Sequence, residues 1–200
     1  MNLPNKLTLA RILMVPAFMV FLFLRLPGEN GETVSRLLAA GLFFIAALTD
    51  LADGKIARKY HLITDFGKFL DPLADKFMVF GAILGFAAGD MYRLPESLHL
   101  AIFICGAVVI FRELAVTSLR LVVSTGGKVV IAASWYGKAK TMSQCIWILI
   151  NILEPVVMAK FDFWEIPLLS WISLGVMTAL TVFSGFDYMK AYWKYLDPTK

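Results

Sequence analysis

Six apolar stretches without a charged residue constrain the fold of this chain more than any other feature. They occupy residues 12–24, 37–49, 77–89, 97–111, 141–153 and 166–186. A helix needs about 20 mostly apolar residues to cross a bilayer, so only the last stretch is long enough without its flanks. Each of the other five helices must include a charged turn at one end. The pattern predicts an all-α integral membrane protein with six transmembrane helices.

The predicted helices form one membrane domain over residues 1–200, with approximate spans 7–25, 34–53, 67–89, 97–120, 134–154 and 166–189. Composition supports this prediction, because 59% of the residues are hydrophobic and 17% are charged. Ordinary soluble domains are nearer 25% charged. Cys105 and Cys145 lie in apolar runs without a CxxC spacing, so we expect neither a disulfide framework nor a thiolate metal site.

The positions of the basic residues predict the orientation in the membrane. If the amino terminus is inside, then of the 19 Lys and Arg residues all fall on that side except Arg25, Arg36, Arg93 and Lys160. Such a bias is typical of cytoplasmic loops and helix ends. We therefore expect a multi-pass protein of the cell (inner) membrane with both termini in the cytoplasm.

Four aspartates lie within the segment DLADGKIARKYHLITDFGKFLDPLAD, which spans residues 50–75. Asp50 and Asp53 are three residues apart and Asp71 and Asp75 are four apart, so each pair projects from one face of its helix. Gly67 continues the face of the second pair, and we expect it to let the two helices approach closely. The four carboxylates are predicted to converge at the cytoplasmic side of the bundle.

Carboxylate oxygens are hard ligands that suit Mg²⁺ or Mn²⁺. Two divalent ions would neutralise four aspartates and leave a site that accepts an anionic diphosphate, whereas one ion would leave two negative charges, so two ions are predicted. Arg58 offers a planar fork for phosphate oxygens, with Lys55 and Lys59 beside it. The small residues Gly54 and Ala57 leave room for a nucleotide.

Other kinds of protein also carry aspartates at a membrane. A divalent-metal carrier, an aspartate-rich prenyltransferase and a non-catalytic membrane protein remain open on the residues alone. Aspartate is costly at membrane depth and usually functional there, which disfavours a purely structural role. A transporter normally binds its ion near the bilayer midplane between repeated halves, whereas here the acids crowd one face.

The aspartate segment resembles the signature of the CDP-alcohol phosphotransferases. Asp50-x-x-Asp53-Gly54-x-x-Ala57-Arg58, eight further residues, and then Gly67-x-x-x-Asp71-x-x-x-Asp75 fill every signature position. The resemblance implies a six-helix membrane enzyme that forms a homodimer and whose four aspartates bind two metal ions. It also implies that Gly54, Ala57 and Arg58 hold the CDP moiety, and that Asp75 is the general base.

Weaker motifs resemble the bacterial phosphatidylglycerophosphate synthases within that family. They are residues 2–11, Arg112-Glu113, residues 118–120 and residues 137–141, beyond which the last two helices look generic. This resemblance implies transfer of a phosphatidyl group from CDP-diacylglycerol to sn-glycerol 3-phosphate, with no nucleic-acid partner. An acceptor of inositol phosphate or serine type remains open.

An acceptor that carries its own phosphate needs further cations. On the same face lie four candidates for this phosphate: Arg112, Arg120, Lys138 and Lys140. We expect Glu113 to orient an arginine. Asn5, Thr8 and Arg11 could line the nucleotide site or serve as ordinary cap and snorkelling residues. Tyr188 is predicted to belong to an aromatic belt at the membrane interface.

The predicted reaction is a one-step displacement. Asp75 would accept the proton of the acceptor 1-hydroxyl, whose oxygen attacks the β-phosphorus as CMP leaves. No Ser, Cys or His nucleophile is paired with a base in this segment, so no covalent intermediate is expected.

Overall fold

The computed structural model describes residues 2–24, 26–60, 64–88, 94–125, 135–161 and 166–193, without the side chains of Leu51, Ala57, Arg58, Lys68, Ser124 and Thr125. The described residues form six helices and no strand. The helices are α1 (Leu3–Phe23), α2 (Gly31–Lys59), α3 (Asp65–Ala87), α4 (Glu96–Thr125), α5 (Trp135–Met158) and α6 (Leu168–Tyr192). Each overlaps one predicted span, which confirms the all-α prediction.

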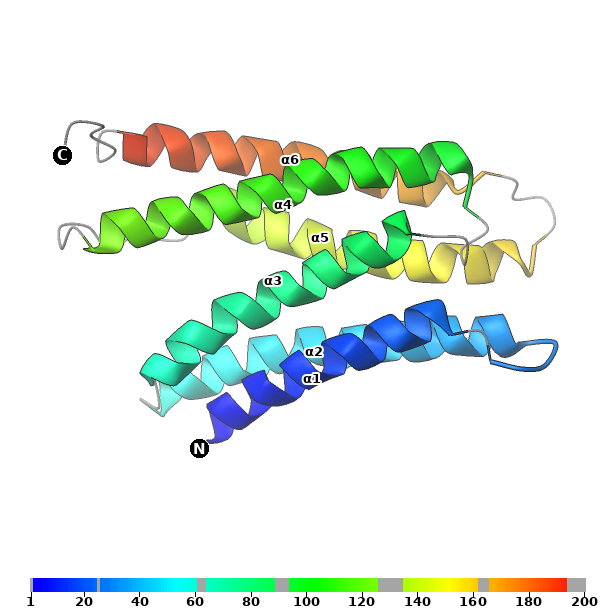
Figure 1. Cartoon of the computed structure of the whole chain (residues 1–200), viewed down its shortest axis with the longest axis horizontal. Helices are drawn as coiled ribbons and strands as arrows, with labels where there is room; N and C mark the ends of the chain where they lie inside the picture. The colour runs from blue at the N-terminus through cyan, green and yellow to red at the C-terminus, as the bar shows by residue number, and fades with distance from the viewer. Residues whose placement is uncertain are drawn as a thin grey trace.

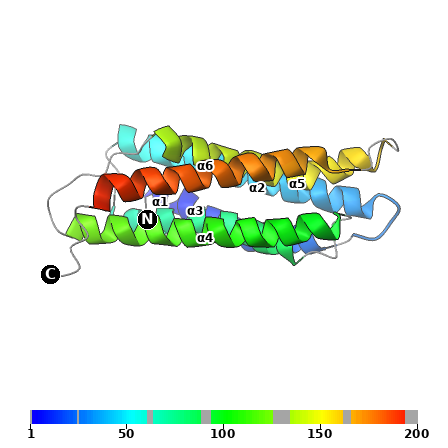
Figure 2. The ribbon, with the colours of Figure 1, turned by 90° about the horizontal axis from the view of Figure 1, so that it is seen from above.

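The helices run back and forth along the long axis of the molecule (Figures 1 and 2). α1, α3 and α5 begin at one end of the bundle, where α2, α4 and α6 finish (Figure 1). We call this the site end, because it contains Asp53, Asp71 and Lys140. α3 crosses the bundle obliquely, and it packs against α1 and also contacts α4 and α5.

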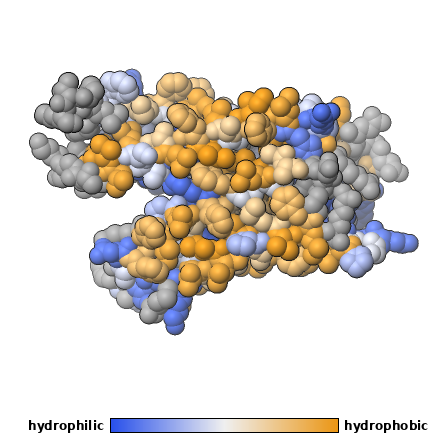
Figure 3. Space-filling model, in the orientation of Figure 1, coloured by the Kyte–Doolittle hydropathy of each residue, from blue (hydrophilic) through white to orange (hydrophobic). Residues whose placement is uncertain are grey.

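The outside of the bundle is strongly apolar, as Figure 3 shows. Phe111 is 75% exposed and Phe186 is 70% exposed, although soluble proteins rarely show broad apolar surfaces. Five of the described helices are long and apolar enough to cross a membrane: α1, α2 as far as Ile56, α4 as far as Val123, α5 and α6. These helices fit a multi-pass membrane protein.

α3 differs from the other five helices in its charge. Asp71, Asp75 and Lys76 fall within every window of 18 residues along α3, so its composition alone does not mark it as a membrane span. The expected count of six spans therefore stays a prediction. The same three residues place charge where α3 meets the other helices of the site end.

Local sequence explains where several helices begin. Asn2 caps α1 by accepting a hydrogen bond from the Asn5 N–H at 3.2 Å, and Thr64 caps α3 by accepting one from the Gly67 N–H at 3.0 Å. α2 continues from the predicted end at residue 53 to Lys59. The apolar run of α2 ends before the helix does, because the polar residues that follow it contain no proline and can continue the helix.

The start of α6 is capped by a residue from another helix. Glu154 of α5 is 5% exposed, and its carboxylate accepts hydrogen bonds from the N–H groups of Leu169 and Ser170 at 2.8 and 2.7 Å. The Ser170 hydroxyl donates a third at 2.5 Å. Helix N-termini leave N–H groups unpaired and favour negative charge, so this contact fastens α6 to α5.

α1 lies between the two helices that carry the aspartates. It packs extensively against α2 and against α3, whereas α2 and α3 make at most marginal direct contact within the described ranges. The prediction that Gly67 lets α2 and α3 approach each other is therefore wrong. A Cβ at Gly67 would lie 2.9 Å from Asn5 Oδ1, so this glycine provides the close approach of α3 to α1.

Candidate active site

Arg11 of α1 lies between the aspartates of α2 and those of α3. Its side chain is fully buried, and Nη1 lies 2.6 Å from Asp50 Oδ1 and 3.0 Å from Asp75 Oδ1. Nη2 pairs with Asp53 Oδ2. Of the two roles left open for Arg11, an ordinary cap or snorkelling residue is excluded, because its buried guanidinium binds three carboxylates from two other helices.

Thr8, one turn before Arg11, contacts Asp71, the one aspartate of the four that Arg11 does not bind. Its hydroxyl oxygen lies 2.9 Å from Asp71 Oδ1 and 3.2 Å from Asp53 Oδ2. The hydroxyl has one proton and can donate to one carboxylate at a time. Thr8 lies between Asp53 of α2 and Asp71 of α3, just as Arg11 lies between Asp50 of α2 and Asp75 of α3.

The four aspartate side chains thus lie together, as the sequence predicts, but the side chains of α1 bring them together. The side chain of Asp53 is 5% exposed, that of Asp50 is 37% exposed and that of Asp75 is 53% exposed. The cluster is closed at Asp53 and open at Asp75. We call these four residues the aspartate cluster.

The donor set suits a hard divalent cation, because it consists of carboxylate oxygens with a neighbouring hydroxyl. The described residues contain no group of three or more His, Cys, Asp or Glu side chains arranged to hold a metal ion. The contacts explain this result, since the carboxylates are directed at Arg11 and Thr8. The oxygen ligands of the aspartate cluster are of the kind that binds a divalent ion. The distances between them are set by Arg11 and Thr8.

The predicted nucleotide-binding residues lie next to the aspartate cluster. Asn5 is 6% exposed and hydrogen-bonds with the Thr64 hydroxyl through both its amide nitrogen, at 2.9 Å, and its amide oxygen, at 3.1 Å. This contact ties the start of α1 to the start of α3. Gly54 is half-buried. The side chains of Ala57 and Arg58 lie outside the described part of the structure.

A second polar cluster contains predicted acceptor residues. Glu113 accepts a hydrogen bond from Arg112 Nη1 at 3.1 Å and also pairs with Lys140, which confirms the expectation that it orients an arginine. Arg112 Nη2 donates to the Ser184 hydroxyl at 2.6 Å. These side chains are nearly buried, so Glu113 holds two cations from different helices in fixed positions.

Arg120 and Lys138 lie further out, where both are exposed. Arg120 donates to the Tyr188 hydroxyl and lies 4.8 Å from the centre of its ring, while Arg112 lies 5.7 Å from the same centre. Tyr188 is 3% exposed. The prediction that Tyr188 belongs to an interfacial belt is wrong, because the ring is buried between two arginines.

The sequence did not identify Ser184 and Thr64 as contact residues, and it predicted a different place for Tyr188. Hydroxyl groups in apolar helices are common, so nothing nearby distinguishes Ser184 or Tyr188 before their neighbours are known. The spacing of residues in α6 does indicate its buried face. Buried residues recur there every three or four positions, at Leu174, Met177, Thr181, Ser184 and Tyr188. That period marks the face of α6 that meets α4 and α5.

The two clusters adjoin at the site end. Lys76, which follows Asp75 in α3, interacts electrostatically with Glu113 and Lys140. Cys145 of α5 lies within electrostatic range of Asp50, Asp75 and Lys140. In Figure 3 the bundle is hollowed between the half with α1 and the half with α4, and hydrophilic surface lies within the hollow. The aspartate cluster and the cations around Glu113 are therefore close neighbours at the site end.

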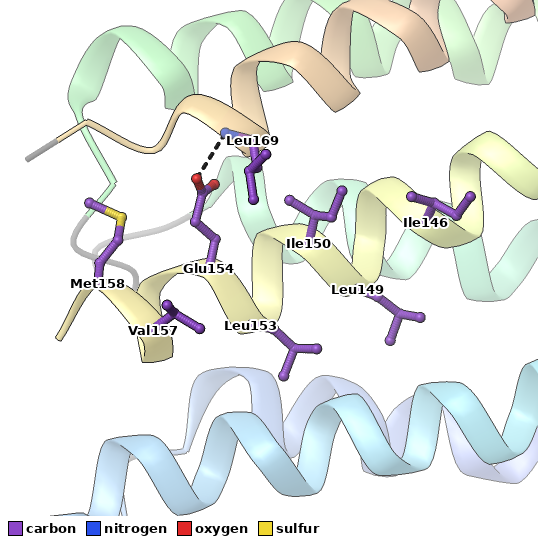
Figure 4. Close-up of a pocket in the computed structure, with 8 residues that line it drawn as sticks. All are labelled: Ile146, Leu149, Ile150, Leu153, Glu154, Val157, Met158 and Leu169. Atoms are coloured by element: carbon purple, nitrogen blue, oxygen red, sulfur yellow. Dashed lines mark hydrogen bonds between the residues drawn. The ribbon is translucent and has the colours of Figure 1, made fainter. Parts of the chain in front are cut away.

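A pocket of about 270 Å³ lies elsewhere, between α5 and the start of α6. Figure 4 shows Glu154 turned toward Leu169 while the other lining side chains are apolar. Glu154 lies fourteen residues beyond Lys140 on α5, which corresponds to about 21 Å along a helix. This pocket offers no group that would bind a phosphate, and it is separate from both clusters.

Comparison with known proteins agrees with the signature. The family model for CDP-alcohol phosphatidyltransferase matches residues 1–183. A CDP-diacylglycerol–glycerol-3-phosphate 3-phosphatidyltransferase of Bacillus subtilis is 41% identical, over 98% of this chain and 97% of the relative. Proteins of the same name are 35% identical in Rickettsia bellii, over 97% of each chain, and 32% identical in Pseudomonas fluorescens, over 98% of this chain and 92% of the relative.

These matches extend the resemblance beyond residue 141, into the last two helices that looked generic in sequence. The family generally uses divalent metal ions, which agrees with the donor set of the aspartate cluster. The aspartate cluster, the adjoining cations and the full-length similarity lead to one conclusion. The chain belongs to the CDP-alcohol phosphatidyltransferase family.

Proposed function

We propose that this protein transfers the phosphatidyl group of CDP-diacylglycerol to sn-glycerol 3-phosphate, with phosphatidylglycerophosphate and CMP as products. The observation that carries this function is the junction of the aspartate cluster with the cationic cluster around Glu113. The first suits a diphosphate and the second suits an acceptor that carries a phosphate. Relatives named for this reaction align over almost the whole chain, which supports the same acceptor.

The proposed arrangement in the membrane is a single domain over residues 1–200 with six spans. α3 completes the set, with its charged first turns at the site end and its apolar remainder in the bilayer. The site end faces the cytoplasm, because most basic residues belong to it. Both termini lie on that side of the cell membrane. A homodimer is part of the proposal through the family resemblance alone.

Asp50, Asp53, Asp71 and Asp75 are the residues that would hold two ions of Mg²⁺ or Mn²⁺. When bound, such ions supply positive charge that offsets the diphosphate and the charge that develops as its bond to CMP breaks. Gly54, Ala57, Arg58, Asn5 and Thr8 would surround the CDP moiety, since they lie beside the aspartates on α1 and α2.

Asp75 is the proposed general base. Its side chain is the most exposed of those that bind Arg11, so it is the carboxylate of this group that an acceptor hydroxyl can reach most readily. Asp75 accepts the proton of the 1-hydroxyl, and that oxygen forms a bond to the β-phosphorus. The bond from this phosphorus to the bridging oxygen breaks, and CMP leaves with the electron pair. The transfer takes one step without a covalent enzyme intermediate.

Arg112, Arg120, Lys138 and Lys140 are the proposed partners of the acceptor phosphate. Glu113 fixes Arg112 and Lys140 but neutralises only one of their two charges, so the cluster retains a positive charge for an anion. Arg120 and Lys138 add exposed cations at the same end. A neutral alcohol would not require this set.

The test is an acceptor panel with the purified full chain in detergent. CDP-diacylglycerol and Mg²⁺ are incubated with sn-glycerol 3-phosphate, inositol phosphate or serine, and the lipid product is identified by mass spectrometry. We expect phosphatidylglycerophosphate and CMP with sn-glycerol 3-phosphate. A lipid formed only with another acceptor would contradict the assignment. Metal uptake into sealed vesicles without CMP formation would favour a carrier.

A further inference from the structure

We propose that Arg11 is the internal counter-cation of the aspartate cluster, and that divalent ions displace it when they bind. The inference rests on the proposed ion site, and it adds a competitor that is part of the chain itself. Arg11 is then a positioning residue that acts through the carboxylates. It holds the cluster together before the ions arrive and withdraws from it afterwards.

The first argument is the burial of Arg11 and the way its guanidinium is used. The side chain is fully buried and pairs with Asp50, Asp53 and Asp75, but its Nε has no hydrogen-bond partner within the described residues. A buried cation is costly unless it is paired. The guanidinium is therefore oriented toward the aspartates, and its Nε–H is left without a hydrogen bond among the described residues.

The second argument is that Arg11 uses oxygens that an ion would use. Asp50 Oδ1 and Asp75 Oδ1 both lie within 3.0 Å of one nitrogen atom, so lone pairs from two helices point at a single position occupied by Nη1. An ion shared by these two oxygens needs the same lone pairs. With Arg11 between the carboxylates, the described residues contain no three acidic, His or Cys side chains arranged around a common ion position.

The third argument is the charge balance of the cluster. Four carboxylates gathered by α1 repel one another, and among the described side chains Arg11 is the cation that contacts three of them. Divalent ions supply more charge in the same place, after which the guanidinium and the ions repel each other. Removal of the charge of Arg11 should therefore strengthen ion binding, although it weakens the ion-free protein.

The experiment measures Mn²⁺ binding by the purified full chain in detergent, with free Mn²⁺ quantified by electron paramagnetic resonance. We compare the wild type with Arg11→Met, which keeps the apolar stem, and with Arg11→Lys, which keeps the charge at a single point. The matched control is Thr8→Val, which removes a contact to Asp53 and Asp71 without any change in charge.

Arg11→Met should lower the Kd for Mn²⁺ about ten-fold or more, because a unit charge within a few ångströms of the ions is removed. Arg11→Lys should lower it less, and Thr8→Val should not lower it at all. In EDTA the Arg11→Met protein should melt below the wild type, and Mn²⁺ should raise its Tm by more than that of the wild type.

An unchanged or higher Kd in Arg11→Met would overturn the proposal, since Arg11 would then assist ion binding. If Arg11→Met does not fold, a Kd of Arg11→Lys at or above the wild-type value overturns it in the same way. Wild-type protein that forms CMP but binds no Mn²⁺ would refute the displacement and leave the proposed function intact. Protein that binds Mn²⁺ as expected but forms no CMP would refute the function alone.

Discussion

Thr8 and Arg11 determine how two pairs of aspartates from separate helices become one cluster. Neither residue needs to touch substrate to have this effect. Thr8 joins Asp53 to Asp71 through one hydroxyl, and Arg11 joins Asp50 to Asp75 through one nitrogen. The separation of the two pairs, and hence their fit to any ion, depends on α1.

Asp71→Asn should reduce CMP release about 100-fold or more, because the neutral amide is a weaker ion ligand and supplies no negative charge. The variant keeps the size of the side chain and can still accept from Thr8. The assay follows CMP from CDP-diacylglycerol and sn-glycerol 3-phosphate in detergent with Mg²⁺. Asp65→Asn, an exposed position in the first turn of α3, is the control and should remain active. Wild-type turnover by Asp71→Asn would remove this residue from the site.

Arg112→Ala should raise the KM for sn-glycerol 3-phosphate about ten-fold or more, in the range expected for a lost charge-assisted hydrogen bond. The KM for CDP-diacylglycerol should change much less. Initial rates measured against each substrate separate the two effects. Lys160→Ala removes an exposed basic residue beyond α5 at the opposite end of the bundle and should alter neither constant. A defect confined to the lipid substrate would place Arg112 outside the acceptor site.

At the scale of elements, α1 is the connector of the site end, and its contact with α3 depends on a glycine. Gly67→Ala would bring a Cβ within 2.9 Å of Asn5 Oδ1 and 3.3 Å of Thr64 Oγ1. We expect a loss of about 1–3 kcal/mol from overpacking, together with lower activity.

Gly41→Ala is the matched substitution within α2, because a Cβ there meets nothing within 4 Å. It should stabilise the helix by roughly 0.5–1 kcal/mol. Thermal unfolding in detergent compares the two variants. Equal effects from both would show that α3 does not pack closely on α1 at Gly67.

The number of helices and the grouping of the aspartates could be predicted from the sequence, because both follow from local patterns. Uncharged runs mark helices in a bilayer, and the spacings of Asp50 with Asp53 and of Asp71 with Asp75 place each pair on one face. The ends of α2 were less predictable, since an apolar run ends before Lys59 while the helix does not.

Contacts between distant segments could not be predicted from these patterns. The insertion of α1 between α2 and α3, the burial of Tyr188 between arginines and the capping of α6 by Glu154 each depend on tertiary packing. The sequence left Arg11 open between a site residue and a snorkelling cation, because arginines near helix ends usually reach the interface. Its three carboxylate partners lie more than thirty positions away in sequence.

At the scale of the whole molecule, the basic site end predicts which side of the membrane each turn faces. After replacement of Cys105 and Cys145, a cysteine at Glu29 should react with an impermeant maleimide in intact cells. A cysteine at Tyr60, which is 60% exposed at the site end, should react only after permeabilisation. Reaction of both positions in intact cells would contradict the six-span orientation, because they lie at opposite ends of α2.

The charged side chains of the two clusters lie at one end of an otherwise apolar bundle. Acidic residues from α2 and α3 meet there through α1, and cations from α4 and α5 meet there through Glu113. Such a division lets a lipid keep its acyl chains in the bilayer while its headgroup reaches polar side chains and water. A soluble acceptor can approach the same place from the water beside this end of the bundle.

The dependence of CMP release on divalent ions tests the central claim most directly. Purified protein is treated with EDTA, the chelator is removed, and CDP-diacylglycerol and sn-glycerol 3-phosphate are supplied over a titration of Mg²⁺. We predict no CMP without the ion and recovery of activity as Mg²⁺ or Mn²⁺ is added. Full CMP release by the ion-free protein would contradict the assignment of the aspartate cluster as an ion-binding catalytic site.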